Sequence, residues 1–347
     1  MASEASDVRA MYEVYPYPLP DHLAEPVYDV ALALDLIVDD LDGNEVLDAG
    51  CGTGHRLVGM ALAHPDTRFV GVDFSTSSLD VGNALAEHHG CDNVEFRKAE
   101  IGGEHLGREF DLVTCTGVLH HLVDPAAGAA WVQEHLKPQG ISYTWHYHPY
   151  GEFDRLIGRR LARLLTGGQV SDDSVAVLAE LGLSLSAQQY GTRTSHSTTS
   201  DQAAIAADVD AYLHPIVNAY RFQETADLFR GAADWIALNG INWLGGSALI
   251  DLADWTGAAP GVLGSGDLFT SSRIRSRFDA LDTDAKLECV ELSLRPTGFT
   301  VVAGRTAALE SGTDRLRGNA MRANLLSQAV EPLAGSVADA VACDRPR

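Results

Sequence analysis

The sequence has few lysines, a deficit of basic residues overall and no long apolar run. Its only lysines are Lys98, Lys137 and Lys286, and 25 basic residues stand against 48 acidic ones, for a formal net charge of −23. Because so acidic a surface repels phosphate backbones, we expect no nucleic-acid partner. No apolar stretch approaches the roughly 20 residues that a membrane-spanning helix needs, so we expect no membrane partner either.

Cysteine is scarce too, and its spacing argues against a disulfide framework and against a zinc site. The five cysteines are scattered, and no two of them form a Cys-x-x-Cys pair. This pattern predicts neither a disulfide framework nor a zinc site, and no metal is expected. The first ten residues lack the basic start and apolar core of a secretory signal, which indicates a cytoplasmic protein. The sequence leaves open whether two copies associate as a homodimer.

Short apolar runs alternate with amphipathic stretches over residues 40–150. The strand-like segments are EVLDAG, RFVGVDFS, VEFRKAE, FDLVTCTG and ISYTWHYH, and helical patterns separate them. Such alternation predicts an α/β fold in which helices cover both faces of a doubly wound parallel sheet. The turn at residues 137–140 is expected to close the last of these helices. Farther along, residues 285–305 are expected to supply the last strand or strand pair.

The pattern changes near residue 150. From there to residue 232 the sequence is mostly helical, and the arginines of RLIGRRLARLL, which begins at Arg155, favour a solvated basic helix face. Prolines prevent a regular helix across residues 11–20. We therefore predict these segments: an N-terminal aromatic lid at 1–30, a ligand-binding core at 31–150, a mainly helical insertion or cap at 151–232, the remainder of the core sheet at 233–305, and a C-terminal helix with a mobile tail at 306–347.

Three glycines follow the first strand-like segment at alternate positions, in VLDAGCGTGHR. Gly50, Gly52 and Gly54 would let a ligand approach the backbone N–H groups at the start of the next helix. A dinucleotide-binding loop would place its third glycine at position 55, but that residue is His55. Asp48 also precedes the first glycine by two residues. Both departures argue against NAD or FAD.

Two acidic residues end the second and third strand-like segments. Asp73, in VGVDFS, follows Gly54 by 19 residues, and its two oxygens could accept both hydroxyls of a ribose. The alternative is that Asp73 caps the following helix. Glu100, in VEFRKAE, could accept a hydrogen bond from an adenine amino group, or it could be an ordinary surface acid.

Together these motifs resemble those of class I S-adenosylmethionine-dependent methyltransferases. VLDAGCGTG, VGVDFS, VEFRKAE and FDLVTCTGVLHHLVDP occur in that order over residues 40–150. The resemblance implies a Rossmann-like, seven-stranded sheet with its last strand antiparallel, and S-adenosyl-L-methionine (SAM) as the cofactor. It places the glycines against the methionyl part of SAM and Asp73 on its ribose, and Glu100 stands where the family usually has Asp. The implied cofactor-binding residues are Asp48, Gly50, Cys51, Gly52, Gly54, Asp73, Phe74, Glu100, Ile101 and Thr116.

A narrower resemblance involves four other stretches. YEVYPYP, GVLHHLVDP, LKPQG and DAYLHPIVNAYRF are similar to a group of bacterial methyltransferases that have a Tyr-Pro-rich N-terminus. That group usually has Pro-Gly-Gly where this chain has Pro138, Gln139 and Gly140. The resemblance makes His214, in YLHPIVNAY, a candidate for contact with the methyl acceptor.

The candidate catalytic residues follow the fourth and fifth strand-like segments, because ligands lie across the carboxyl ends of parallel strands. Of His120 and His121, one is expected to face the cleft as a general base, with positioning or packing as the alternative. In YTWHYHPY, alternation puts Tyr143, Trp145 and Tyr147 on one face and Thr144, His146 and His148 on the other. His148 is a catalytic candidate and His146 and Tyr150 are substrate candidates, with strand-end packing as the alternative.

The tyrosines of the proline-rich N-terminus are the candidate lid. Tyr12 and Tyr17 are expected to contact the acceptor, and Tyr15 is a candidate for the catalytic centre, unless the segment is only an ordered strap. The predicted function is methyl transfer to an O, N or C nucleophile of a small molecule, such as an amine, a guanidine or a natural-product intermediate. The acidic balance favours a neutral or cationic acceptor. The alternatives are a peptide or protein methyltransferase and a SAM-binding regulatory protein without turnover.

Overall fold

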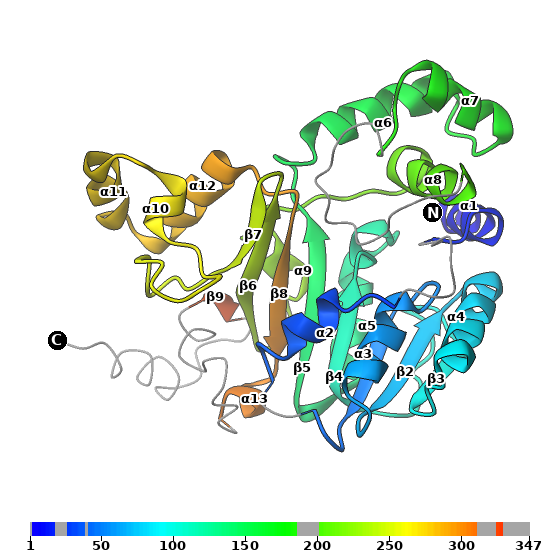
Figure 1. The fold of residues 1–347 in the computed structure, drawn as a ribbon, viewed down its shortest axis with the longest axis horizontal. Coiled ribbons are helices and arrows are strands. Elements are labelled where there is room, and N and C mark those ends of the chain that lie inside the picture. Colours follow the sequence, from blue (N-terminus) through cyan, green and yellow to red (C-terminus); the bar gives the residue numbers. More distant parts are fainter. Residues whose placement is uncertain (1, 18–25, 39–40, 186–200, 311–323, 329–347) are drawn as a thin grey trace.

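The computed structural model describes residues 2–17, 26–38, 41–185, 201–310 and 324–328. Their centre is one mixed sheet with helices on both sides (Figure 1). The strand order is β3-β2-β1-β4-β5-β8-β6-β7, and β9 also pairs with β6. The strands are β1 (Glu45–Ala49), β2 (Arg68–Asp73), β3 (Val94–Lys98), β4 (Phe110–Thr116), β5 (Leu136–Tyr147), β6 (Trp235–Trp243), β7 (Gly246–Leu249), β8 (Gly298–Gly304) and β9 (Leu325–Gln328).

The direction of the strands confirms the predicted fold class. Strands β1 to β5 pair in parallel, while β8 runs antiparallel to both of its neighbours, β5 and β6. Strands β1 to β6 with β8 are thus the expected seven, and the last of them is the antiparallel one. The sheet has nine strands in the described residues because β7 forms a hairpin with β6 and β9 pairs with the other half of β6.

Helices cover the two faces of this sheet, and the alternation of strand side chains explains how. On one face, Val70, Val113 and Phe299 pack with α5, α11 and α12; on the other, Val46 and Phe69 pack with α2 and α3. The helices and single turns are α1 (Ala2–Val14), α2 (Asp29–Leu34), α3 (His55–Ala63), α4 (Thr76–His89), η1 (Leu119–His121), α5 (Pro125–Glu134), α6 (Phe153–Leu165), α7 (Asp172–Glu180), α8 (Asp201–Asp208), the π-helix η2 (Val209–Leu213), α9 (Thr225–Leu228), α10 (Ser265–Leu268), α11 (Ser272–Asp279), α12 (Thr283–Leu294) and α13 (Thr306–Glu310). None of the described helices is both long and apolar enough to cross a membrane.

A separate helical group sits above the carboxyl ends of the parallel strands. Helices α6, α7 and α8 with η2 form it, and α1 approaches it from the N-terminus (Figure 1). Its small core includes Met11, Ala162 and Tyr212. Helix α1 ends at Val14, two residues before Pro16, as the loss of a backbone donor at proline requires.

Three local predictions differ from the structure. Residues 137–140 are not a turn but the start of β5, which has an irregular register there because Pro138 cannot donate to the ladder. Residues 285–294 belong to α12, so the predicted segment 285–305 supplies one strand only, β8. Leu325–Gln328 form β9, where a helix was expected. Residues 186–200, within the predicted cap, and residues 311–323 and the tail from 329, within the predicted C-terminal segment, lie outside the described residues.

Candidate functional site

The glycine loop joins β1 to α3 in a left-handed backbone path. Gly50, Gly52 and Gly54 have φ values of 77°, 53° and 74°, a backbone region that residues with a Cβ rarely adopt. A Cβ on Gly50 would lie 2.5 Å from a methyl group of Val118, and one on Gly54 would lie 2.7 Å from the ring of Phe96. Gly50 and Gly52 line the cleft described below, whereas Gly54 does not, since it begins α3 and packs inward. The loop therefore leaves bare backbone facing the cleft.

Asp73, at the end of β2, is tied to this loop. Its Oδ2 accepts a hydrogen bond from the N–H of Gly52 at 3.0 Å, and its Oδ1 accepts one from the N–H of Ser75 at 2.9 Å. Burial raises the pKa of its carboxyl, although these backbone hydrogen bonds favour the charged form. The alternative was that Asp73 caps α4, but the N-cap of that helix is Ser75. Each oxygen keeps a lone pair for a ligand.

Asp48 is a second buried carboxyl on the same cleft. It lies in β1, and its Oδ1 accepts a hydrogen bond from the hydroxyl of Thr114 at 2.8 Å. Burial raises its pKa to about 6. A cationic group placed beside Asp48 would favour its charged form, which makes this position suitable for an ammonium group.

A cleft of about 1510 Å³ connects these groups with the helical group above them. Its lining contains every predicted cofactor residue except Gly54, including Phe74, Ile101, Thr116 and Cys51. Glu100 lines it as well, and its carboxylate forms an ion pair of 3.0 Å with Arg9 of α1. Helix α1 thus lies across the end of the cleft where the sequence predicts the adenine.

The predicted lid contributes two of its three tyrosines to the cleft. Tyr12 and Tyr17 line it, and the hydroxyl of Tyr12 donates to Oδ1 of Asp210 at 2.6 Å. Tyr15 points elsewhere: its hydroxyl contacts the carboxylate of Asp172 at 3.4 Å, and it is absent from the lining. The structure therefore gives no support to a catalytic Tyr15.

Strand β5 shows the predicted alternation, but the cleft opens on the face that carries no histidine. Tyr143, Trp145 and Tyr147 line the cleft, whereas His146 and His148 are buried on the opposite face. His146 has its Nε2 2.9 Å from the hydroxyl of Thr144. The sequence thus correctly predicted which side chains of β5 share a face. It assigned the substrate and catalytic roles to His146 and His148, which lie on the face away from the cleft.

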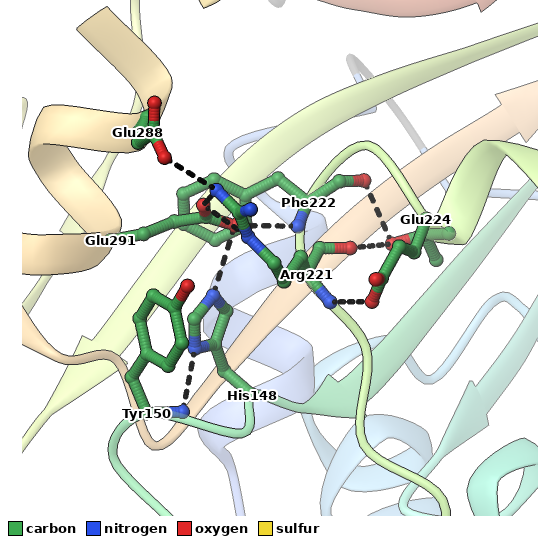
Figure 2. A network of polar contacts seen from close by, with 8 residues as sticks. His148, Tyr150, Arg221, Phe222, Glu224, Glu288 and Glu291 are labelled. Carbon is green, nitrogen blue, oxygen red and sulfur yellow. Dashed lines mark hydrogen bonds and ion pairs between the residues drawn. The ribbon is translucent and has the colours of Figure 1, made fainter. Parts of the chain in front are cut away.

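His148 and Tyr150 belong to a buried polar network instead (Figure 2). The N–H of Tyr150 donates to Nδ1 of His148, so Nε2 carries the proton that is donated to Glu291 at 3.0 Å. Glu291 also accepts the N–H of Phe222 at 2.9 Å and pairs with Arg221. Hydrogen bonds from His148 and Arg221 outweigh the effect of burial and lower the pKa of Glu291. This network joins β5, the segment before α9, and α12.

The two neighbouring histidines of η1 have different surroundings. His121 lines the cleft, and its Nδ1 donates to the carbonyl of Ile216 at 2.8 Å, which leaves the lone pair of Nε2 free. His120 is fully buried with its ring 4.0 Å from that of Tyr147, and neither of its nitrogens has a hydrogen-bond partner among the described residues. Burial lowers the pKa of both imidazoles. The structure thus makes His121 the candidate base and His120 a packing residue.

His214 lies directly behind His121, with ring centroids 4.0 Å apart, and does not line the cleft itself. Together with Asp210 these residues bring one potential ligand atom each to within 4.8 Å of one another, a spacing that could hold a metal ion. However, the N–H of Ile216 donates to Nδ1 of His214 at 3.0 Å, so the proton of the neutral ring sits on Nε2. A nitrogen that carries a proton is no metal ligand. We therefore interpret the group as a hydrogen-bonding site.

Sequence reasoning missed the charged residues at this end of the cleft. Arg155 of α6 lies with its guanidinium 4.2 Å above the ring of Tyr147, pairs with Glu152 and donates to the carbonyl of Ala211 at 3.1 Å. It is buried, so the arginines of this helix do not form the solvated face that was expected. Asp210 is held in a π-helix, a local distortion that is frequent at functional sites. The one sequence signal was its position within DAYLHP.

A glycine loop after β1, a carboxylate at the end of β2 and an antiparallel strand between β5 and β6 define the class I methyltransferase architecture. Comparison with known proteins agrees. Residues 40–181 match the family described as "Methyltransferase domain". An uncharacterized protein of Synechococcus sp., syc1184_c, is 29% identical over 86% of this chain and 71% of its own length. The ubiquinone biosynthesis O-methyltransferase of Leptothrix cholodnii is 35% identical over 31% of this chain and 46% of its own.

Among solved structures, PKMT2 from Rickettsia typhi superimposes with a TM-score of 0.54 and 17% identity, over 84% of this chain and 55% of that one. This likeness concerns the fold alone. The chain spans about half the length of the O-methyltransferase and of PKMT2. Residues 40–181 are thus a methyltransferase domain of the class I, SAM-dependent type, and SAM is the cofactor with which such domains work.

Proposed function

We propose that this chain methylates a small molecule, and that the preferred nucleophile is a hydroxyl oxygen held beside His121. The observation that carries the proposal is the tautomer of His121, a residue that lines the cleft. Its Nδ1 donates to the carbonyl of Ile216, which leaves Nε2 as a hydrogen-bond acceptor.

The cofactor would be held by the groups already described. Asp73 offers two oxygens to the ribose, Asp48 offers a carboxylate to the methionyl ammonium, and the loop of Gly50 and Gly52 permits close approach of the backbone. The fit is supported by the position of Gly50 and Gly52 on the cleft and by the lone pairs that Asp73 keeps free. Bound SAM supplies an electrophilic methyl group on a sulfonium. Everything else is positioning and proton transfer by the protein.

The acceptor nitrogen of His121 favours a hydroxyl over an amine. A hydroxyl group is a weak nucleophile until a base takes its proton, and it can donate that proton to Nε2 of His121 while a lone pair on its oxygen attacks the methyl group. A neutral amine attacks through its lone pair without such a base. Because burial lowers the pKa of His121, its ring is neutral and able to accept the proton near pH 7.

The charge and size of the cleft support a neutral or cationic small molecule. Eight carboxylate residues but only three arginines line it, and each arginine is paired: Arg9 with Glu100, Arg56 with Asp29 and Arg155 with Glu152. An anionic acceptor would find no free cation among the described lining residues. A pocket for one small ligand usually has about 300–1,000 Å³, so the 1510 Å³ here leaves room for an acceptor beside SAM.

The test is a methyl-transfer assay with isotopically labelled SAM and a panel of phenols, alcohols, amines, guanidines and short peptides. Mass spectrometry of the products locates the methyl group. Methylation at oxygen agrees with the proposal. Methylation only at nitrogen would show that the acceptor is an amine and not a hydroxyl compound. Transfer confined to peptides would make the chain a peptide methyltransferase. Tight binding of S-adenosylhomocysteine without any transfer would favour the regulatory alternative.

A further inference from the structure

Helix α6 carries an apolar stripe on its outer surface. Its members are between 45% and 62% exposed, and their spacing of three, four or one residues puts them on one side of the helix. They make up five of the fourteen large exposed apolar residues in the described part of the chain. The stripe consists of Phe153, Ile157, Leu161, Leu164 and Leu165. Scattered apolar residues are normal on a surface, but a contiguous stripe indicates an interaction site.

The helix cannot turn this stripe inward. On its inner side Arg155 is bound to Glu152 and to a backbone carbonyl, and Arg163 donates to the carbonyl of Leu213 at 3.1 Å. Gly158 fits tightly, because a Cβ there would lie 2.9 Å from Leu183. Figure 1 shows α6 along the upper border of the molecule, with α8 on its inner side; η2, which directly follows α8, packs against α6. No described element covers its outer side.

We propose that this stripe is a homodimer interface in which the α6 helices of two copies pack against each other about a two-fold axis. The exposed parts of the five side chains amount to roughly 500 Å², so two copies together would bury about 1,000 Å², the lower limit for a specific interface. A surface that contacts itself is the usual arrangement in a symmetric dimer.

Charge favours a protein partner over an anionic membrane. Arg160 is the only base of this helix that is exposed rather than partly or fully buried, and the chain carries a net charge of −23. A helix that binds anionic membranes is typically rich in Lys and Arg on its polar face.

The experiment is sedimentation equilibrium of the full chain at micromolar concentration. We expect twice the monomer mass of 37.1 kDa for the wild type and the monomer mass for Ile157→Glu/Leu161→Glu. The matched control is Leu292→Glu, on α12, because Leu292 is 57% exposed and lies off the stripe; it should remain a dimer. Circular dichroism and binding of S-adenosylhomocysteine establish that each variant is folded, and Ile157→Ser/Leu161→Ser replaces the glutamate pair if that pair misfolds.

Two results would overturn the proposal. One is a monomeric wild type, and the other is a dimer that persists in both double variants while they remain folded. Co-sedimentation of a monomeric wild type with phosphatidylglycerol vesicles would assign the stripe to a membrane surface instead. The dimer does not depend on the proposed chemistry, so the methyl-transfer assay can fail without affecting this outcome.

Discussion

Replacement of Asp73 tests the cofactor site most directly. In the wild type, each carboxylate oxygen of Asp73 accepts one backbone N–H and retains a lone pair for a ligand in the cleft. Asp73→Ala removes both oxygens. A hydrogen bond to a charged group contributes about 1.5–3 kcal/mol. Loss of two such bonds to the ribose hydroxyls would therefore cost about 3–6 kcal/mol. At 1.4 kcal/mol for each factor of ten, the dissociation constant should rise roughly 10²–10⁴-fold.

The assay is isothermal titration calorimetry with S-adenosylhomocysteine. Asp80→Ala is the matched control, because Asp80 is an exposed carboxylate on the neighbouring helix α4 and its loss changes the net charge equally. Asp73→Ala also removes the acceptor for the N–H groups of Gly52 and Ser75, so a fall in melting temperature is expected as well. Titration must be done well below that temperature.

Asp73→Asn distinguishes the ribose contact from the loop contact. The amide keeps one acceptor oxygen but turns an NH₂ group toward one of the two backbone donors, so it should bind more weakly than the wild type and more tightly than Asp73→Ala. If folded Asp73→Ala bound S-adenosylhomocysteine as tightly as Asp80→Ala does, Asp73 would not contact the ribose and the assignment of this end of the cleft would be wrong.

Four other predictions address the remaining parts of the site. His121→Ala should lower kcat by about 10²–10⁴-fold with unchanged affinity for S-adenosylhomocysteine. His120→Phe changes a packing residue and should leave most of kcat. Equal losses of kcat in the two variants would show that His121 is not the general base. Since burial raises the pKa of Asp48 to about 6, its carboxylate is lost as pH falls through 6, and calorimetry should show weaker cofactor binding there, with a flat profile in Asp48→Asn. Tyr12→Phe deletes the hydrogen bond to Asp210, and a rise in the acceptor KM without a change in cofactor affinity is expected; the reverse pattern in steady-state kinetics would argue against a lid over the acceptor. Glu291→Gln should cost about 1.5–3 kcal/mol of unfolding free energy in urea titrations at neutral pH, because buried His148 and partly exposed Arg221 lose a charged acceptor. The folded pKa of Glu291 is lowered, so its contribution is full above the unfolded pKa near 4.5 and is lost as pH falls through the folded pKa; a variant with wild-type stability at pH 7 would show that the network contributes nothing.

The cofactor end of the cleft was predictable because its geometry is local. A strand, three left-handed glycines and a helix start occupy one short stretch, and Asp73 comes from the adjacent parallel strand, so spacing alone brings these groups together. The acceptor end is different. Tyr12 and Asp210 are 198 residues apart in the sequence yet share a hydrogen bond of 2.6 Å. Alternation in β5 identified which side chains share a face, but only the packing of Glu291 against His148 decides which face is covered.

The arginines of α6 were predicted to face solvent, and the reason why most of them do not also explains the apolar outer surface of this helix. Periodicity correctly placed Arg155, Arg159 and Arg163 on one side of a helix, and the usual preference of arginine for water assigned that side to solvent. The structure reverses it, because the backbone carbonyls of Ala211, Leu213 and His214, at the end of η2, need donors and the arginines supply them. Once the charged side is used to cap a neighbouring helix, the apolar side of α6 has no neighbour among the described elements. The same contacts that shape the acceptor end of the cleft therefore leave a surface that a second copy can cover.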